Sequence, residues 1–127
     1  MNTPIIVLGA GGHAKVCVDL LLRQGRTIIG YAGPAPSDWM ELRGIQYIGE
    51  DAQIAEFDAR YVTLVNGIGM IGHSLLRSRI FTHLRSQGYT FETLVHDSAI
   101  VSSDVELEEG VQIMAGAIVQ AGSTIGV

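Results

Sequence analysis

Two glycine-rich segments contain the residues of this sequence that are best suited to chemistry. The first is GAGGHA, residues 9–14, which follows a short apolar run and precedes a segment with helical periodicity. Gly9, Gly11 and Ala14 match the pattern G-x-G-x-x-G/A, in which backbone N–H groups at a helix N-terminus bind a phosphate, helped by the helix dipole. The pattern predicts a phosphate-binding loop. The alternative is that these glycines form only a tight turn.

A histidine and an asparagine accompany these glycines. His13 is expected in the first helical turn, where its imidazole can hydrogen-bond a nucleotide or a sugar hydroxyl, unless it is a surface or helix-capping histidine. Asn66 opens the second segment, NGIGMIG, and offers both a donor and an acceptor; its alternative role is to form a turn before Gly67. Both segments follow an apolar run, so we expect them at one carboxyl edge of a parallel sheet, where they define a ligand crevice.

Alternating strands and helices must position these segments. Short apolar runs predict strands at 5–8, 27–31, 45–48 and 61–65, and helices are expected at 14–24, 50–57 and 73–88, with 32–44 as a loop and Asp51 as an N-cap. This alternation predicts a parallel sheet with helices on both faces, a small Rossmann-like α/β domain over residues 1–94. The expected core-facing positions of the first and last helices are Val16, Leu20, Leu21, Leu76, Ile80 and Leu84, and the expected solvated positions are Arg77, Arg79 and Arg85.

A six-residue period replaces the helices from Val95 onward. Aliphatic residues recur at that spacing, at Val101, Leu107, Ile113, Val119 and Ile125. Such a period predicts the first turns of a left-handed parallel β-helix over residues 95–127, with these side chains pointing inward and about three hexads in each turn. A hairpin or meander would instead require period two and polar turn dipeptides. We expect the chain to stop within this β-helix, after fewer than two turns.

Composition and charge exclude several classes of function. The net charge of −5 argues against nucleic acid and anionic membranes as partners, and no apolar run is long enough to span a membrane. The single Cys17 excludes an intramolecular disulfide. His73, His83 and His96 have no mutual spacing suited to metal ligation together with Cys17, so we expect no metal site. We expect a cytoplasmic protein. Dinucleotide oxidoreduction is disfavoured because the first acidic residue after the second predicted strand, Asp38, lies too far into the loop to hold a ribose.

Three segments in this order and spacing resemble a known family: VLGAGGHAKV, LVNGIG and the stretch from TLVHDSAIV to the end of the chain. They are similar to the bacterial sugar O- and N-acyltransferases of the sialic-acid O-acetyltransferase type, which include the UDP-4-amino-sugar N-acetyltransferases (PglD-like). The resemblance covers the whole chain. It implies an N-terminal domain that binds a UDP- or CMP-linked sugar, and a β-helix that binds acetyl-CoA as co-substrate and forms a homotrimer.

The resemblance also assigns residues. Gly9, Gly11, Gly12 and His13 match the family's first nucleotide-sugar loop, and Asn66, Gly67 and Ile68 match the second. The family usually carries acidic residues just after the second strand, where this chain has Ala32, Gly33 and Pro34.

The family's catalytic histidine lies in a later Asp-His-Asp-like segment, beyond Val127. The resemblance therefore predicts an acetyl-CoA-dependent acyltransferase of surface glycan biosynthesis. These 127 residues would carry mainly its sugar-nucleotide-binding part and would be inactive alone. The alternative function is a non-catalytic nucleotide-sugar-binding module.

Overall fold

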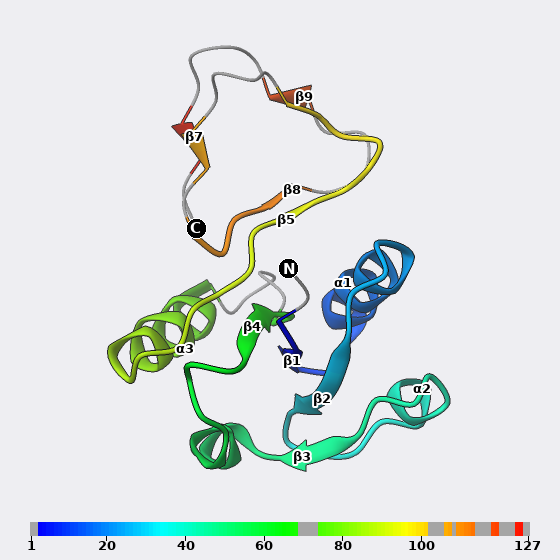
Figure 1. The fold of residues 1–127 in the computed structure, drawn as a ribbon, viewed down its shortest axis with the longest axis vertical. Helices are drawn as coiled ribbons and strands as arrows, with labels where there is room; N and C mark the ends of the chain where they lie inside the picture. Colours follow the sequence, from blue (N-terminus) through cyan, green and yellow to red (C-terminus); the bar gives the residue numbers. More distant parts are fainter. Residues whose placement is uncertain are drawn as a thin grey trace. The chain divides into compact units, whose positions relative to one another are not determined.

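The computed structural model describes residues 3–68, 74–101, 106–107, 109–113, 118–119 and 124–125 of the chain. The chain divides into two compact units, Met1–Thr90 and Phe91–Val127 (Figure 1). The first contains a mixed α/β arrangement, and the regular elements described in the second are short strands. Among the described residues, no helix has both the length and the apolar character that crossing a membrane requires.

A four-stranded parallel sheet organises the first unit. Its strands are β1 (Ile5–Leu8), β2 (Ile28–Ala32), β3 (Tyr47–Gly49) and β4 (Thr63–Asn66), and their order across the sheet is β3-β2-β1-β4. The last residues of the strands lie side by side, because Leu8 pairs with both Ala32 and Asn66, and Ala32 pairs with Gly49. All four following loops therefore leave the sheet at one edge.

The core of this unit is formed by the sheet and by helix α1 (Gly12–Arg23). Every residue of the apolar strand β1 is fully buried, which explains its continuous run of large aliphatic side chains. Helix α1 packs on β1 and β2 (Figure 1). The side chains that it buries are Ala14, Cys17, Val18, Leu20 and Leu21. The prediction for Val16 was wrong, because this side chain is 51% exposed.

The helix α3 (Ser74–Ser86), the next described element after β4, differs from the sequence prediction in the face that it buries. Its C-terminal half contributes Leu84 to the core, whereas the predicted core residue Leu76 is 47% exposed. Arg77 was predicted on the solvated face, and this was wrong: it is only 8% exposed. The helix thus buries a face that contains an arginine, which apolar periodicity does not reveal.

Two short helices differ from the sequence prediction. The predicted loop after β2 contains the four-residue helix α2 (Asp38–Glu41), whose N-cap Ser37 accepts a hydrogen bond from the Met40 N–H at 3.4 Å. The next predicted helix is the 3₁₀ helix η1 (Asp51–Glu56), and its N-cap is Glu50 rather than Asp51. Glu50 and Gln53 form a reciprocal capping box.

The second unit is a three-sided coil of parallel two-residue strands (Figure 1). Leu94 pairs with Gln112, Ile100 with Ile118 and Glu106 with Thr124, each partner standing three hexads later in the sequence. This confirms a parallel β-helix with three hexads per turn. Its strands are β5 (Leu94–Val95), β6 (Ile100–Val101), β7 (Glu106–Leu107), β8 (Gln112–Ile113), β9 (Ile118–Val119) and β10 (Thr124–Ile125).

The predicted inward positions of the coil are described in part. Ile113 is buried, and Val101 and Leu107 are half-buried. The side chains of Val119 and Ile125 lie outside the described part of the chain. Beside the coil's first strand, the Phe91 N–H donates to the Glu109 carboxylate at 2.9 Å.

Candidate functional site

Three glycine-containing loops meet at the carboxyl edge of the sheet. The Gly9 N–H donates to the Ala32 carbonyl at 2.6 Å, which ties the loop after β1 to the end of β2. Gly9 has a φ of +90°, a conformation that favours glycine, and a Cβ on it would lie 3.4 Å from the Gly67 carbonyl oxygen. A Cβ on Gly33 would have only the Gly9 Cα near it, at 3.9 Å. The structure thus brings together the two predicted glycine segments.

Gly67 is a glycine because of close packing. A Cβ there would stand 2.5 Å from the Leu8 carbonyl oxygen and 2.8 Å from the Ala14 Cβ, both closer than van der Waals contact allows. The loop after β4 therefore passes directly over the end of β1 and the first turn of α1. This glycine has a structural reason that is independent of any ligand.

Gly11 and Gly12 are different, because open space surrounds both. Apart from the chain neighbours and the adjacent helix backbone, no atom of the described residues lies within 4 Å of the position that a Cβ would take on either residue. Gly11 is the N-cap of α1 and Gly12 is its first residue, and no side chain caps this helix. Open backbone at the positive end of a helix dipole is suited to a phosphate group. Packing accounts for Gly9 and Gly67, and it does not account for these two.

His13 lies where the sequence placed it, in the first turn of α1, and is half-buried. Its Nε2 lies 3.6 Å from the Cys17 Sγ, one turn further along the helix. Burial raises the pKa of the Cys17 thiol to about 11, and the nearby positive charge of Arg77 only partly opposes this. Cys17 is therefore a protonated, buried thiol and is unsuited to act as a nucleophile.

The side chain of Asn66 shapes the second loop. Asn66 is 3% exposed, and its Nδ2 donates to the Arg77 carbonyl at 3.3 Å while its Oδ1 accepts from the Ile68 N–H at 3.2 Å. Arg77 lies on α3 and contacts the same loop. Its Nη1 donates to the Asn66 carbonyl at 3.1 Å and to the Ile68 carbonyl at 2.7 Å. Residues 66–68 are thus held from both sides by one buried arginine and one buried amide. A ligand-binding role for Asn66 and Ile68 stays a prediction.

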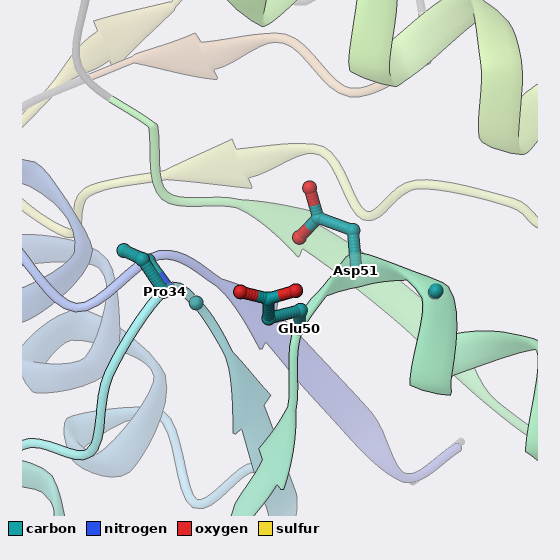
Figure 2. Close-up of a pocket in the computed structure, with 5 residues that line it drawn as sticks. Pro34, Glu50 and Asp51 are labelled. Atoms are coloured by element: carbon teal, nitrogen blue, oxygen red, sulfur yellow. The ribbon is translucent and has the colours of Figure 1, made fainter.

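A pocket of about 280 Å³ lies at the same edge, between the ends of β2 and β3. It is lined by Gly33, Pro34, Glu50, Asp51 and Ala52. Figure 2 shows that the carboxylates of Glu50 and Asp51 both project into the space that Pro34 borders. Burial and the neighbouring charge of Glu50 raise the pKa of Asp51. Neither acid belongs to a glycine-rich segment, so the sequence motifs did not indicate them; their position directly after β3 is the signal that marks them as neighbours of this edge.

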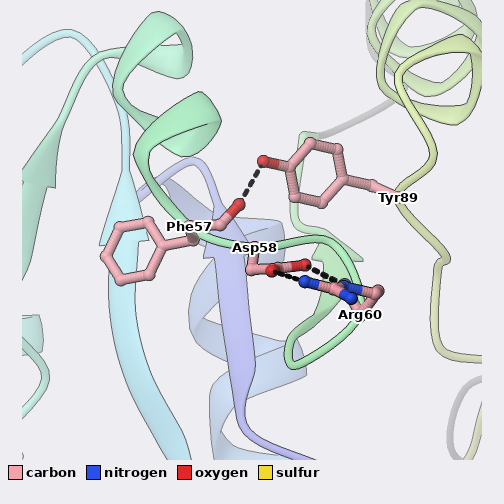
Figure 3. A network of polar contacts seen from close by, with 4 residues as sticks. All are labelled: Phe57, Asp58, Arg60 and Tyr89. Carbon is pink, nitrogen blue, oxygen red and sulfur yellow. Dashed lines mark hydrogen bonds and ion pairs between the residues drawn. The ribbon is translucent and has the colours of Figure 1, made fainter.

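A second polar network belongs to the scaffold. The Tyr89 hydroxyl lies 2.7 Å from the Ile54 carbonyl oxygen and 2.6 Å from that of Phe57, and Asp58 forms an ion pair with Arg60 at 2.8 Å (Figure 3). Hydrogen bonds from Arg60 lower the pKa of Asp58 to about 2. Residues 57–60 precede β4, so they lie at the amino edge of the sheet, opposite the glycine loops.

Within the described part of the chain, no group of three or more His, Cys, Asp or Glu side chains is arranged to hold a metal ion. The groups that the described residues present at the carboxyl edge are suited to ligand recognition. This edge offers open backbone at a helix N-terminus, a half-buried imidazole and a pair of carboxylates.

Comparison with known proteins places this geometry among sugar acetyltransferases. The family model of the PglD N-terminal domain matches residues 4–84. PerB from Caulobacter crescentus, in a crystal structure with CoA and GDP-perosamine, is 31% identical with a TM-score of 0.83; the match covers 97% of this chain and 56% of that one. The acetyltransferase domain of PglB from Neisseria gonorrhoeae, in complex with acetyl coenzyme A, is 25% identical with a TM-score of 0.86, covering 99% and 60%.

A histidine-to-alanine mutant of the GDP-perosamine N-acetyltransferase from Caulobacter crescentus, also with CoA and GDP-perosamine, is 30% identical with a TM-score of 0.83, covering 97% and 57%. No curated protein sequence matches the chain. The chain therefore spans 56% to 60% of the length of these solved structures.

Proposed function

We propose, because this chain belongs to the PglD-like family of sugar N-acetyltransferases, that its first unit binds a nucleotide-linked amino sugar whose amine is the acceptor of an acetyl group from acetyl-CoA. The proposal includes the seven residues that the family pattern selects, which are Gly9, Gly11, Gly12, His13, Asn66, Gly67 and Ile68.

The observation that carries this proposal is the contrast between the glycines of the two loops. Gly9 and Gly67 allow the loops to approach each other, whereas no other described residue places an atom within 4 Å of a Cβ position on Gly11 or Gly12. A diphosphate is the part of a nucleotide-sugar that such a helix N-terminus would bind. His13 lies in the same turn, and its proposed role is to donate a hydrogen bond to a phosphate or to a sugar hydroxyl.

The proposed reaction is acyl transfer. The sugar amine attacks the thioester carbonyl carbon, a C–N amide bond forms, the C–S bond breaks, and CoA leaves as the thiol. The attacking nitrogen must lose a proton, so the reaction requires a general base. We assign no catalytic base within the described part of the chain. The contribution proposed for these residues is to bind and orient the acceptor, which lowers the entropic part of the barrier.

The identity of the nucleotide is a separate matter. The sequence resemblance implies UDP- or CMP-linked sugars, whereas the PerB structures contain GDP-perosamine. Assembly as a homotrimer, a cytoplasmic location and a place in surface glycan biosynthesis accompany the proposal as predictions.

Isothermal titration calorimetry with GDP-, UDP- and CMP-linked sugars tests the proposal directly. We expect at least one of them to bind the chain in the absence of acetyl-CoA. Folded protein that binds none of them contradicts the proposal. A thiol-release assay with acetyl-CoA and a bound amino sugar then separates an enzyme from a non-catalytic binding module, because only the enzyme releases CoA.

A further inference from the structure

We propose that Arg77 is the buried counter-charge for the phosphate groups of the ligand, and that it acts through the loop of residues 66–68 without contacting the ligand. This inference rests on the proposed function and adds a positioning residue to the seven named there. The juxtaposition behind it is a buried cation, with no acidic partner among the described residues, next to the two loops that meet at the carboxyl edge.

The guanidinium of Arg77 is both buried and charged. The residue is 8% exposed, and burial lowers its pKa, but a guanidinium does not lose its proton in proteins. Its Nη1 donates to the carbonyls of Asn66 and Ile68 at 3.1 and 2.7 Å. These acceptors are neutral, so they satisfy hydrogen bonds and leave the positive charge uncompensated. Buried charges in folded proteins are normally paired with an opposite charge.

The described residues supply no negative charge to this cation. None of their carboxylates forms an ion pair with Arg77. The titratable group that interacts with it electrostatically is the Cys17 thiol on α1. Burial raises the pKa of this thiol to about 11, so at pH 7 the thiol is protonated and neutral. A bound anion is the group that would complete the pair.

The loop of residues 66–68 separates Arg77 from the first turn of α1. Its carbonyls face Arg77, and Gly67 packs against the glycine loop after β1 and the start of the helix. A Cβ on Gly67 would lie 2.8 Å from the Ala14 Cβ, and a Cβ on Gly9 would lie 3.4 Å from the Gly67 carbonyl oxygen. One layer of backbone therefore lies between the guanidinium and the proposed phosphate site.

Cys17 gives an independent measure of the same spacing. Its Sγ lies 3.6 Å from the His13 Nε2, and the thiol also interacts electrostatically with Arg77. Cys17 follows His13 by about one helical turn, which is about 5.4 Å along the axis. One turn plus a contact distance places the guanidinium roughly 10 Å from the N–H groups of the first turn.

A charge at that distance affects binding because it is buried and salt screens it weakly. At an effective dielectric constant of about 20, two unit charges ~10 Å apart interact strongly enough to change an affinity by about tenfold. Water in an open crevice reduces this effect to about three- to tenfold. The chain carries a net charge of −5, so its average field opposes an anion. A local cation offsets that field where the phosphates bind.

A purely structural role is the competing explanation, because the hydrogen bonds of Arg77 also hold the loop. The two roles require different properties of the side chain. A structural clamp requires the planar fork of the guanidinium, whereas a counter-charge requires only the positive charge. Lysine separates the two roles, since it keeps the charge and loses the fork.

The test measures by calorimetry the affinities of GDP, GMP, UDP and UMP for the wild-type chain and for variants at position 77. A diphosphate has one more charged phosphate group than a monophosphate. The ratio of the two affinities therefore reports how the site responds to ligand charge, and two bases are used so that base recognition cancels.

The variants are Arg77→Lys, which keeps the charge, and Arg77→Gln and Arg77→Met, which remove it while keeping a polar group or the apolar volume. Arg79→Gln is the matched control, because it removes the same charge from an exposed position of the same helix. Circular dichroism verifies that each variant is folded, and either neutral variant suffices for the comparison.

We expect the ratio of diphosphate to monophosphate affinity to fall by about three- to tenfold in the neutral variants. Arg77→Lys should keep most of the ratio although it is less stable than the wild type, and Arg79→Gln should leave the ratio unchanged. A ratio that neutral variants do not change would overturn the inference, even where all affinities fall together, because a structural role alone would produce that result.

A ratio that Arg77→Lys loses as completely as Arg77→Gln would overturn it as well, because the fork would then matter and not the charge. In both cases nucleotides still bind the wild-type chain, and the proposed function stands. A folded wild-type chain that binds none of the four nucleotides would remove both.

Discussion

Replacing Gly67 with alanine tests the packing of the two glycine loops. The new Cβ would lie 2.5 Å from the Leu8 carbonyl oxygen, 2.8 Å from the Ala14 Cβ and 2.9 Å from the Ala14 Cα. None of these atoms can rotate away, because they belong to the backbone or are fixed directly on it. Gly67 is not among the glycines with positive φ, so the cost of the substitution is steric and not conformational.

The size of the effect follows from these distances. Overpacking a well-packed site costs about 1–3 kcal/mol, and three immobile neighbours favour the upper half of that range. The lower entropy of an unfolded chain with alanine returns about 0.4–1 kcal/mol. We therefore expect Gly67→Ala to lower the free energy of unfolding by about 2 kcal/mol. With a urea m-value of about 1–3 kcal/mol/M, the midpoint should fall by roughly 1 M.

Gly12→Ala is the matched control. Outside its own helix turn, no described residue has an atom within 4 Å of the new Cβ. Gly12 is also the first residue of helix α1, where alanine is a better helix former than glycine. Stability should be unchanged or higher by up to about 1 kcal/mol. The methyl group would nevertheless stand where a phosphate approaches the helix N-terminus, so nucleotide affinity should fall. The two substitutions thus separate fold from binding.

Urea denaturation followed by circular dichroism gives the stabilities, and calorimetry with a nucleotide-sugar gives the affinities. Gly67→Ala within about 0.5 kcal/mol of the wild type, with unchanged affinity, would refute the account of loop packing. Gly12→Ala that is strongly destabilised would contradict the open space around that residue. Gly12→Ala that binds as tightly as the wild type would remove Gly12 from the phosphate site.

Three further predictions concern single side chains. Arg77→Ala should lower the free energy of unfolding by about 1–3 kcal/mol in urea titrations, because it leaves two loop carbonyls without their donor, and Arg77→Lys should restore only part of this. Asp51→Asn should stabilise the chain at pH 7, because the raised pKa of Asp51 means that its ionised form lowers the stability of the folded state. The advantage of the asparagine should shrink as the pH falls towards the ordinary aspartate value of 3.8, which thermal melts across pH 3–7 would measure. Cys17 should react with iodoacetamide at pH 8 only at the rate of unfolding, because its thiol is buried and its pKa is about 11; fast labelling of the native chain would contradict this.

The sequence by itself determined most of the elements and their type, the two short helices α2 and η1 excepted. The strands, the first and last helices and the glycine loops follow from short-range causes: apolar periodicity, glycine at turns and the match of a six-residue repeat to a three-sided coil. These causes act within a few residues, so the amino-acid sequence shows them directly. They also sufficed to bring Gly9 and Gly67 to one edge, since parallel strands all end on the same side.

Only the tertiary structure decided what those elements present to one another. Arginine is a residue type that is usually exposed, but the chain at the end of β4 supplies two backbone acceptors for Arg77. The side chain reaches these acceptors only when α3 is packed beside β4. Glu50 and Asp51 line a pocket together with Gly33 and Pro34 because the strand order places β3 next to β2, which no local pattern encodes. Burial and hydrogen-bond partners depend on contacts between residues distant in sequence, and such contacts are fixed by packing the whole domain.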